Sequence, residues 1–324
     1  MSEDAAPLLA IEGLTVAFRG EDETLRVVEE ASLTLRAGEA VGLVGESGCG
    51  KSVTAMSVMR LLPTPPAKIE AGRIRFDGED LLQLGEPRMR AIRGDRIGMV
   101  FQEPMTSLNP TLTIGFQIAE VLRVHRGMSG AQALEEAVRL LAAVGVGAPR
   151  RRVEQYPHQL SGGLRQRAMI AMALACRPRL LIADEPTTAL DVTIQAQILD
   201  LLRRLRQEFQ MALLLITHDL GVVAELCDRV SVMYAGRIVE EAPAASLFRR
   251  PRHPYTLGLL ASRPRLGGTA DRLATIPGNV PPPGRRGVGC SFVDRCPRRL
   301  ARCATERPAL LPLDGASAAC WNPA

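Results

Sequence analysis

The sequence contains little lysine, few aromatic residues and no long apolar run. Lysine occurs only at Lys51 and Lys68, although Lys and Arg together number 40, and aromatic residues make up 3% of the 324 residues. No apolar run reaches the roughly 18 residues that would span a bilayer. The N-terminus, Met1 to Asp4, is acidic and lacks the basic region of a signal peptide. We therefore expect a cytoplasmic chain without a membrane-spanning segment.

Charge, hydrophobic content and cysteine usage further narrow the class of protein to which the chain can belong. The formal net charge is +5, and the arginines are scattered among acidic residues, which argues against nucleic-acid binding. Hydrophobic residues make up 46% of the chain, which is enough for a full core, and the length accommodates one large domain plus an appendage. In a reducing compartment the seven cysteines are expected to be thiols or metal ligands rather than disulfides.

A glycine-rich loop organises the chain. It follows the apolar run 40–44, precedes a helix-compatible stretch at 53–62 and matches the phosphate-loop pattern G-x-x-x-x-G-K-[ST]. Its residues are Gly45, Glu46, Ser47, Gly48, Cys49, Gly50, Lys51 and Ser52. Glycines let backbone N–H groups turn toward an anion, and the following helix contributes its positive end. We expect the Lys51 ammonium to reach the β and γ phosphates and the Ser52 hydroxyl to bind Mg²⁺.

The rest of the first 250 residues alternates strands and helices, which is typical of an α/β fold. The expected strands are 8–18, 27–35, 69–77, 96–101, 179–183, 212–217, 230–234 and 236–240. Apolar residues recur at helical spacing over 112–145, which predicts a helical insertion between strands of a mixed sheet. Further helices are expected over 168–176 and from 191 to about 209.

Three polar residues follow strands at the edge where ligands of α/β folds bind. Asp184 and Glu185 come directly after the strand at 179–183. One carboxylate can orient a Mg²⁺-bound water, and the next can position or deprotonate an attacking water. His218 follows the strand at 212–217 and fits either a contact with a γ-phosphate or an ordinary surface or capping role.

Two further features are weaker evidence for a nucleotide site when each is considered alone. Ser161 fits an N-cap, and Gly162 and Gly163 expose backbone N–H groups at the start of a helix, although Ser-Gly-Gly also fits an ordinary turn. Phe18 lies upstream of the phosphate loop, where its ring either stacks on an adenine or belongs to the core.

The composition changes at about residue 250. A connector rich in Pro and Gly at 276–284 leads to Cys290, Cys296, Cys303 and Cys320, spaced C-x5-C-x6-C-x16-C. The last 35 residues are too short and polar to bury a core of their own, so a metal centre would supply the missing cross-links. Zinc, an iron–sulfur cluster and free structural thiols are all compatible with this spacing.

Together these features resemble the ATP-binding cassette (ABC) ATPases. The resemblance covers about residues 8–250 and rests on the phosphate loop, Gln102, the Leu160–Gly163 signature, Asp184-Glu185, Ala189-Leu190-Asp191 and His218. Segments 44–48, 100–110 and 191–197 are similar to the dipeptide/oligopeptide/nickel importer branch, and segment 164–172 to its D-type ATPase subunit. Segment 253–256 and the cysteine-rich tail resemble the C-terminal extension of that branch.

The resemblance implies an α/β fold with an ABC-type P-loop NTPase core and a small Cys-rich C-terminal extension. The core would contain a mixed sheet, an antiparallel β-subdomain and an inserted helical subdomain. The nucleotide-binding domain would cover residues 1–250, with the helical subdomain at about 103–165. The extension, with its four-Cys cluster, would cover residues 251–324.

The resemblance also implies ATP and Mg²⁺ as the ligands of the site. In this family two subunits enclose two ATP molecules, each between the phosphate loop of one chain and the signature of the other. The nucleotide-binding residues would be those of the loop together with Phe18, Gln102, Ser161, Gly162, Gly163, Asp184 and Asp191. Mg²⁺ would be bound by Ser52, Gln102 and Asp184. Glu185 would be the general base, with His218 and Gln102 as further catalytic residues.

The implied function is that of the ATP-hydrolysing subunit of a membrane importer for dipeptides or oligopeptides. Its partners would be a homologous second ATPase subunit, two transmembrane permeases and an extracytoplasmic solute-binding protein, and it would lie peripherally on the cytoplasmic face of the inner membrane. In members of this branch the tail cysteines can hold a [4Fe-4S] cluster, with zinc as the alternative here. Import of nickel or another small solute, and a non-transport soluble ABC ATPase acting on ribosomes or DNA, remain the alternative functions.

Overall fold

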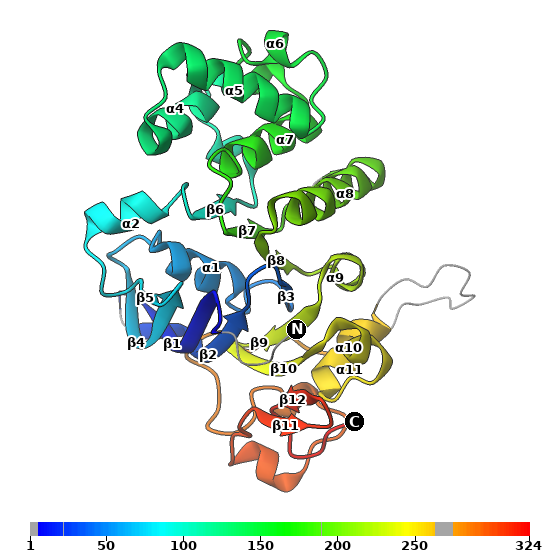
Figure 1. Ribbon diagram of the computed structural model, residues 1–324. Helices are drawn as coiled ribbons and strands as arrows, with labels where there is room; N and C mark the ends of the chain where they lie inside the picture. Colours follow the sequence, from blue (N-terminus) through cyan, green and yellow to red (C-terminus); the bar gives the residue numbers. More distant parts are fainter. Residues whose placement is uncertain (1–5, 22, 189, 263–274) are drawn as a thin grey trace. The chain divides into compact units, whose positions relative to one another are not determined.

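The computed structural model describes residues 6–21, 23–188, 190–262 and 275–324, and the chain forms two compact units (Figure 1). The first unit comprises residues 1–35, 40–82 and 216–324, and the second comprises residues 36–39 and 83–215. Both units combine strands with helices, in agreement with the predicted α/β class. Among the described residues, none of the helices has the length and apolar character needed to cross a membrane.

An antiparallel sheet in the first unit confirms the predicted β-subdomain. Its order is β2–β1–β4–β5, formed by β1 (Leu9–Arg19), β2 (Thr24–Leu35), β4 (Ala67–Phe76) and β5 (Glu79–Asp80). The pairing of β1 with β2 is irregular at Gly13, which has φ +59°, because the register shifts between Ile11 and Leu14. The side chains of Ile11 and Leu14, on either side of this shift, are both buried.

A second group of strands in this unit positions the glycine-rich loop. β3 (Ala40–Val44) pairs in parallel with β9 (Arg229–Tyr234), and β9 pairs antiparallel with β10 (Arg237–Pro243). All five residues of β3 are buried, which is typical of a central parallel strand. Helix α9 (Leu220–Leu226) packs closely on β3, because a Cβ on Gly42 would lie 2.7 Å from Val223. The chain continues from β3 through the loop into α1 (Lys51–Met59).

Residues after β10 extend the same sheet. They form α10 (Ala244–Arg249), α11 (Pro254–Ala261), the short 3-10 helices η2 (Val293–Arg295) and η3 (Ala301–Ala304), and the strands β11 (Leu311–Leu313) and β12 (Ala316–Ala318). β12 pairs antiparallel with β10, so that Glu240 lies opposite Ala318. The sheet order in this unit is therefore β11–β12–β10–β9–β3, and the C-terminal residues attach to the core through main-chain hydrogen bonds.

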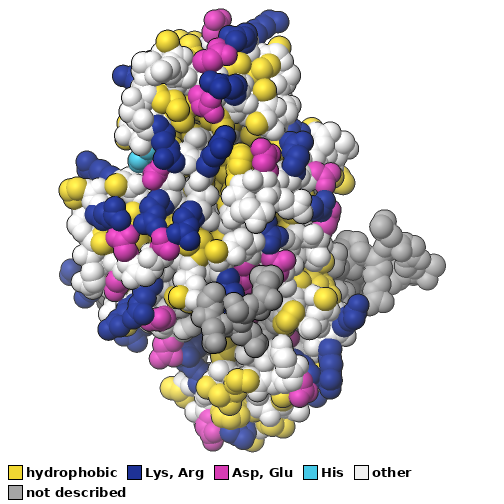
Figure 2. All heavy atoms as spheres, in the orientation of Figure 1, with side chains coloured by type: hydrophobic (Ala, Val, Ile, Leu, Met, Phe, Trp, Pro, Cys, Tyr) yellow, Lys and Arg dark blue, Asp and Glu magenta, His cyan; other side chains and the backbone are white. Residues whose placement is uncertain are grey.

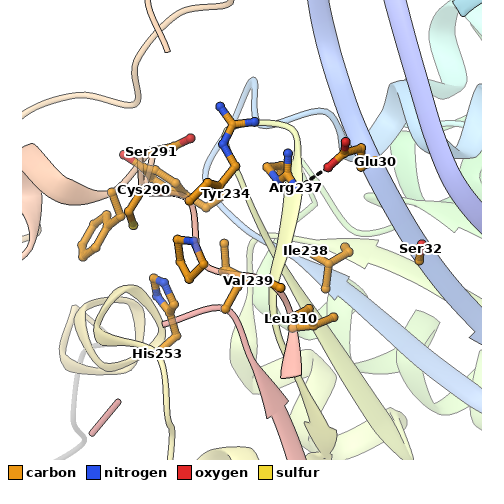
Figure 3. A pocket seen from close by; sticks show the side chains of 15 residues that line it. Glu30, Ser32, Tyr234, Arg237, Ile238, Val239, His253, Cys290, Ser291 and Leu310 are labelled. Atoms are coloured by element: carbon orange, nitrogen blue, oxygen red, sulfur yellow. Dashed lines mark hydrogen bonds and ion pairs between the residues drawn. The ribbon is translucent and has the colours of Figure 1, made fainter. Parts of the chain in front are cut away.

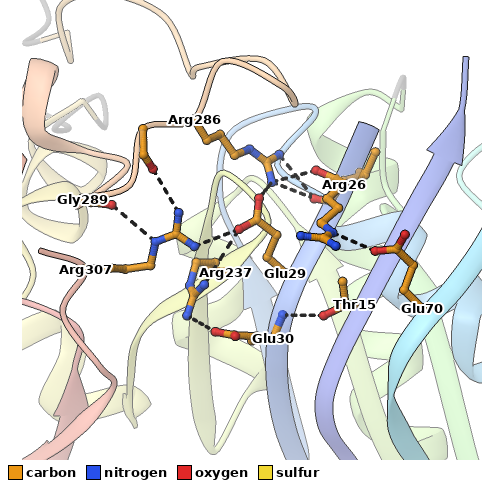
Figure 4. Close-up of polar contacts among 11 residues, drawn as sticks. Thr15, Arg26, Glu29, Glu30, Glu70, Arg237, Arg286, Gly289 and Arg307 are labelled. Atoms are coloured by element: carbon orange, nitrogen blue, oxygen red, sulfur yellow. Dashed lines mark hydrogen bonds and ion pairs between the residues drawn. The ribbon is translucent and has the colours of Figure 1, made fainter. Parts of the chain in front are cut away.

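Ion pairs to Glu29 on β2 provide a second attachment of the C-terminal residues (Figure 4). Arg286 Nη1 and Arg307 Nη1 lie 3.1 Å and 2.9 Å from its two carboxylate oxygens. The side chains of Arg286 and Glu29 are 4% and 17% exposed, so solvent screens this pair only weakly.

The second unit contains parallel strands and most of the helices. β6 (Ile97–Val100) pairs in parallel with β7 (Leu180–Asp184), and β7 neighbours β8 (Ala212–Thr217), whose first four residues belong to this unit. Its helices are α2 (Glu86–Ile92), α3 (Pro104–Ser107), α4 (Ile114–Arg126), α5 (Gly130–Ala143), α6 (Pro149–Arg152), the 3-10 helix η1 (Pro157–Gln159), α7 (Gly162–Ala173) and α8 (Val192–Phe209).

Cap residues divide the predicted helical insertion into two helices. The Thr113 side chain accepts a hydrogen bond from the N–H of Phe116 at the start of α4, and Gly127 ends this helix in the left-handed conformation, φ +64°. Ser129 begins α5 in a capping box with Gln132. Helices α4, α5 and α7 pack against one another, so the helical region predicted over 112–145 is confirmed.

Charged side chains of both signs mix on the face drawn in Figure 2. Surface pairs such as Arg150 with Glu135 and Arg93 with Glu86 join opposite charges at 2.7 Å and 2.6 Å. On that face the arginines therefore form a solvated mixed surface rather than a stripe of one sign.

Candidate nucleotide site and the cysteine cluster

The glycine-rich loop lies between β3 and α1, as the sequence predicts, and its shape depends on two glycines. Gly45 has φ +155°, and a Cβ there would lie 2.1 Å from the carbonyl oxygen of Met233 on β9. Gly50, the N-cap of α1, has φ +107°, a conformation that side chains rarely adopt. Larger residues at either position would displace the loop.

Lys51 is the first residue of α1 and folds its side chain back over the loop. Its ammonium donates to the carbonyl oxygens of Gly45 at 2.8 Å and Glu46 at 3.0 Å, and it lies 3.7 Å from the sulfur of Cys49. Lys51 is only 5% exposed. Burial raises the pKa of the Cys49 thiol, so this thiol is protonated at neutral pH. The hydrogen bonds of the Lys51 ammonium thus hold the beginning and the end of the loop together.

The remaining predicted residues of the first unit differ in exposure. Ser47 and Gly48 form the exposed part of the loop, and Ser52 is half-buried in the first turn of α1. His218 is exposed directly after β8. Phe18 is half-buried near the end of β1, where it pairs with neighbouring strands β2 and β4, and its adenine contact remains a prediction.

Asp184 and Glu185 lie at the end of β7 in the second unit. They are 3% and 9% exposed, and Glu185 has φ +46°, which turns the chain out of the strand. The hydroxyl of Thr188 donates to Glu185 Oε2 at 2.6 Å and orients this carboxylate. Gln102 is exposed just after β6. Because β6 and β7 are parallel, Gln102 and the acidic pair lie at the same sheet edge.

The signature segment begins α7, as expected for its Ser-Gly-Gly start. Ser161 is the N-cap, although its side chain makes no capping hydrogen bond, and Gly162 is the first helical residue. A Cβ on Gly163 would lie 2.9 Å from the side chain of Ile194 on α8. Gln166, for which no sequence motif predicted a role, donates to the carbonyl of Pro186 at 2.6 Å. The signature helix is therefore tied to the turn that follows Glu185.

Asp191 has a structural role at the start of α8. Its side chain accepts a hydrogen bond from the N–H of Ile194 at 2.9 Å, which makes it the N-cap of this helix. Ala189, the first residue of the Ala189-Leu190-Asp191 motif, lies outside the described residues. The nucleotide contact predicted for Asp191 remains a prediction.

The four tail cysteines line one small pocket, which also contains Trp321. Cys290, Cys296, Cys303 and Cys320 are all free. Burial raises the pKa of Cys290 to about 11, so this thiol is protonated at neutral pH. Across residues 6–21, 23–188, 190–262 and 275–324, no three Cys, His, Asp or Glu side chains are arranged to hold a metal ion. The donor chemistry suits zinc or an iron–sulfur cluster, but this arrangement is not a formed metal centre.

An aromatic cluster beside these cysteines joins the C-terminal residues to the core. The rings of Tyr255 and Phe292 lie 4.5 Å and 5.2 Å from that of Tyr234 on β9, and all three side chains are at most 2% exposed. An adjoining cavity has a volume of ≈ 190 Å³, and its lining includes Tyr234, His253 and Cys290. Figure 3 shows these three side chains around it. Burial lowers the pKa of His253 to about 4, and its Nδ1 accepts the N–H of Tyr255.

Sequence patterns do not predict this cluster, because its members are far apart in the chain. Nor do they predict two contacts that the C-terminal residues make with the loop itself, from Tyr255 and Arg295 to Glu46. The aromatic content of 3% offered one signal, since three of so few aromatic rings meet at one place.

Two family models match the chain. The ABC transporter model covers residues 28–188, and the model for the oligopeptide/dipeptide transporter, C-terminal region, covers residues 239–303. A probable peptide ABC transporter ATP-binding protein of Sinorhizobium fredii is 54% identical over 317 residues, which cover 97% of this chain and 95% of the relative. A Brucella abortus protein, provisionally named a peptide import ATP-binding protein, is 56% identical over 315 residues, or 94% and 93% of the two chains.

Solved structures confirm the predicted cassette fold. A dimeric ATP-binding cassette in a post-hydrolysis state with ADP and Pi is 30% identical, with a TM-score of 0.66, over 73% of this chain and 98% of that one. A Clostridium perfringens protein that is part of an ABC transporter complex has a TM-score of 0.63 at 24% identity, over 76% and 92% of the two chains. The protein is therefore an ATPase of the ABC transporter family, in the branch of ATP-binding subunits that carry the oligopeptide/dipeptide transporter C-terminal region.

Proposed function

We propose that this protein is the ATP-hydrolysing subunit of a membrane importer for dipeptides or oligopeptides. The observation that carries the proposal is the presence on one chain of the cassette motifs and of a C-terminal region of the oligopeptide/dipeptide transporter type. Support comes from relatives with peptide transport or import in their names, which match over more than nine-tenths of the chain. The proposed domains are residues 1–250 and 251–324, with a helical subdomain at about 103–165.

In this proposal the loop from Gly45 to Ser52 binds the ATP phosphates. Its N–H groups and the positive end of α1 face the anion, and the Lys51 ammonium exchanges its two loop carbonyls for phosphate oxygens. The Ser52 hydroxyl, the Gln102 amide and the Asp184 carboxylate supply oxygen ligands, which is the donor chemistry that Mg²⁺ prefers. Phe18 supplies a ring for the adenine.

Glu185 acts as the general base that activates the attacking water. Its orientation by Thr188 supports this role, because a base must be held within reach of the proton it removes. His218 contacts the γ-phosphate, and Gln102 helps to position the water. The segment from Ser161 to Gly163 binds the ATP held by a partner subunit, together with Asp191.

We further propose the partners of this ATPase. Dimers occur among the solved cassettes that it resembles, which supports pairing with a second, homologous ATPase subunit. Two transmembrane permeases and an extracytoplasmic solute-binding protein would complete the importer. The ATPase would then lie peripherally on the cytoplasmic face of the inner membrane.

The tail cysteines are proposed to bind a metal centre, a [4Fe-4S] cluster in the first instance and zinc as the alternative. Four thiols that share one pocket support this proposal, and the absence of a ready-made metal geometry in the described residues weighs against it. Anaerobically purified protein with iron, sulfide and broad visible absorbance would support the cluster. Colourless protein with stoichiometric zinc would replace it by the alternative, and metal-free protein would refute both.

Purification of the complex tests the transport proposal directly. The ATPase is expected to co-purify with permeases and with a binding protein whose bound ligand, identified by mass spectrometry, is a peptide. Nickel or another small solute as the bound ligand would support the proposed importer architecture but identify a different transported solute. Co-sedimentation with ribosomes or DNA, without membrane subunits, would contradict the transport function.

A further inference from the structure

Glu46, the second residue of the phosphate loop, is held by a side chain from the C-terminal extension. Arg295, the last residue of η2, forms a two-pronged ion pair with it. Nη1 lies 2.7 Å from Glu46 Oε2 and Nη2 lies 2.9 Å from Oε1. The Arg295 side chain is 5% exposed and that of Glu46 is 30% exposed, so the pair is largely shielded from solvent. Such bidentate pairs fix geometry as well as supplying attraction.

Arg295 is itself held rigidly. Its Nε donates to the carbonyl of Pro277 at 2.9 Å, its Nη1 to the hydroxyl of Tyr234 at 3.3 Å, and its Nη2 to the carbonyl of Ile276 at 3.3 Å. With the two oxygens of Glu46, these groups provide one acceptor for each of the five N–H bonds of the guanidinium. The Arg295 guanidinium also lies 5.9 Å from the ring of Phe292. A side chain so fully bonded has little freedom to follow a moving loop.

The backbone of Glu46 is held by the same region. Its N–H donates to the hydroxyl of Tyr255 at 2.8 Å, and Tyr255 is completely buried in the aromatic cluster. The carbonyl of Glu46 accepts the Lys51 ammonium at 3.0 Å. A continuous series of contacts therefore runs from Arg295 and Tyr255 through Glu46 to the lysine of the phosphate loop.

We propose that Arg295 is a positioning residue of the nucleotide site, through which the C-terminal extension holds the phosphate loop in its ATP-binding shape. This inference rests on the proposed binding of ATP at Gly45–Ser52. Arg295 acts through Glu46 and does not touch the reacting atoms. Without it, the only remaining contact described above between the extension and Glu46 is the hydrogen bond from its N–H to the Tyr255 hydroxyl, and the loop samples shapes in which its N–H groups and Lys51 no longer converge. Affinity for ATP falls by the fraction of time spent in such shapes.

The test is the ATP dissociation constant of the full-length protein, measured by titration with a fluorescent ATP analogue. Arg295→Ala is expected to weaken binding about tenfold or more, within the usual range of coupling between sites. Arg295→Lys, which cannot form the two-pronged pair, is expected to recover only part of the loss. In the assembled transporter, KM for ATP is expected to rise more than kcat falls.

Arg307→Ala is the matched control. It removes another arginine–glutamate ion pair between the extension and the core, formed through a single nitrogen, and its partner is Glu29 on β2 and not the loop. The expected result is an unchanged ATP dissociation constant. Trp321, the single tryptophan of the chain, lies in the extension and reports whether this region is folded in each variant.

A double variant distinguishes an effect that Arg295 exerts through Glu46 from a general destabilisation of the protein. If Arg295 acts through Glu46, then Arg295→Ala combined with Glu46→Gln binds ATP no more weakly than the worse single variant. Wild-type affinity in Arg295→Ala would overturn the inference, as would strictly additive losses or an equal loss in Arg307→Ala. If the wild-type protein and Lys51→Ala bound ATP equally, the proposed ATP site itself would fail instead.

Discussion

Replacing Phe292 by alanine tests how the C-terminal extension is attached to the cassette. Phe292 is 2% exposed, and its ring lies 5.2 Å from Tyr234, 5.5 Å from Tyr255 and 5.8 Å from His253. Truncating a buried Phe to Ala typically costs about 3–5 kcal/mol, and aromatic pairs contribute roughly 0.5–1.5 kcal/mol of such losses. We therefore expect Phe292→Ala to lower the free energy of unfolding of the extension by about 4 kcal/mol.

Urea unfolding followed by Trp321 fluorescence is the suitable assay, because this single tryptophan lies in the extension and donates to the Glu306 carbonyl at 3.0 Å. With an m-value of about 1–3 kcal/mol/M, the loss corresponds to a fall of the midpoint by about 1.3–4 M urea. Val288→Ala is the control, since Val288 is 77% exposed and its change should stay within about 0.5 kcal/mol. Equal midpoints for the two variants would refute the conclusion that Phe292 anchors the extension.

Three further changes test other parts of the structure. Gly45→Ala puts a Cβ 2.1 Å from the Met233 carbonyl oxygen and should abolish measurable ATP binding. Gly48→Ala puts a Cβ where no atom lies within 4 Å, and it should weaken ATP binding less. Weaker ATP binding by Gly48→Ala than by Gly45→Ala would contradict the loop geometry. His253 has a folded pKa of about 4, below its unfolded value, so stability should fall as pH drops from 7 to 4.5, by about 2–3 kcal/mol from this residue. His253→Asn keeps a capping acceptor and should remove that part of the pH dependence in urea titrations; an unchanged slope would show that His253 is not its source. Asp191→Ala removes the N-cap of α8 and should cost about 1 kcal/mol in thermal unfolding, with a smaller cost for Asp191→Asn.

Local patterns predicted the cassette well because its elements carry their signals within a few residues. The strand at 212–217 has the bounds of β8, and the buried run at 40–44 those of β3. The phosphate loop was found from glycine and lysine spacing, and Gly45 and Gly50 do adopt the conformations that this spacing implies. In these segments the backbone geometry and the residue types are determined together.

The attachment of the extension could not be predicted in this way. Arg295 and Glu46 are 249 positions apart, and no local pattern marks which carboxylate an arginine will meet. The β11–β12 hairpin did carry a local signal that was overlooked, because Asp314-Gly315 is a favoured hairpin turn and both residues have positive φ, +44° and +76°. The C-terminal extension therefore contains regular secondary structure, the β11–β12 hairpin, although its composition predicts only a connector and a metal site.

The most direct test of the account is ATP-driven peptide uptake by the assembled transporter in vesicles, compared between the wild type and Glu185→Gln. The amide is nearly isosteric with the carboxylate and cannot accept the proton of the attacking water. We predict that the variant complex binds ATP as the wild type does, hydrolyses it at a rate lower by at least about a hundredfold, and accumulates no peptide. Hydrolysis and peptide uptake at the wild-type rate in Glu185→Gln would contradict the assignment of Glu185 and the mechanism built on it.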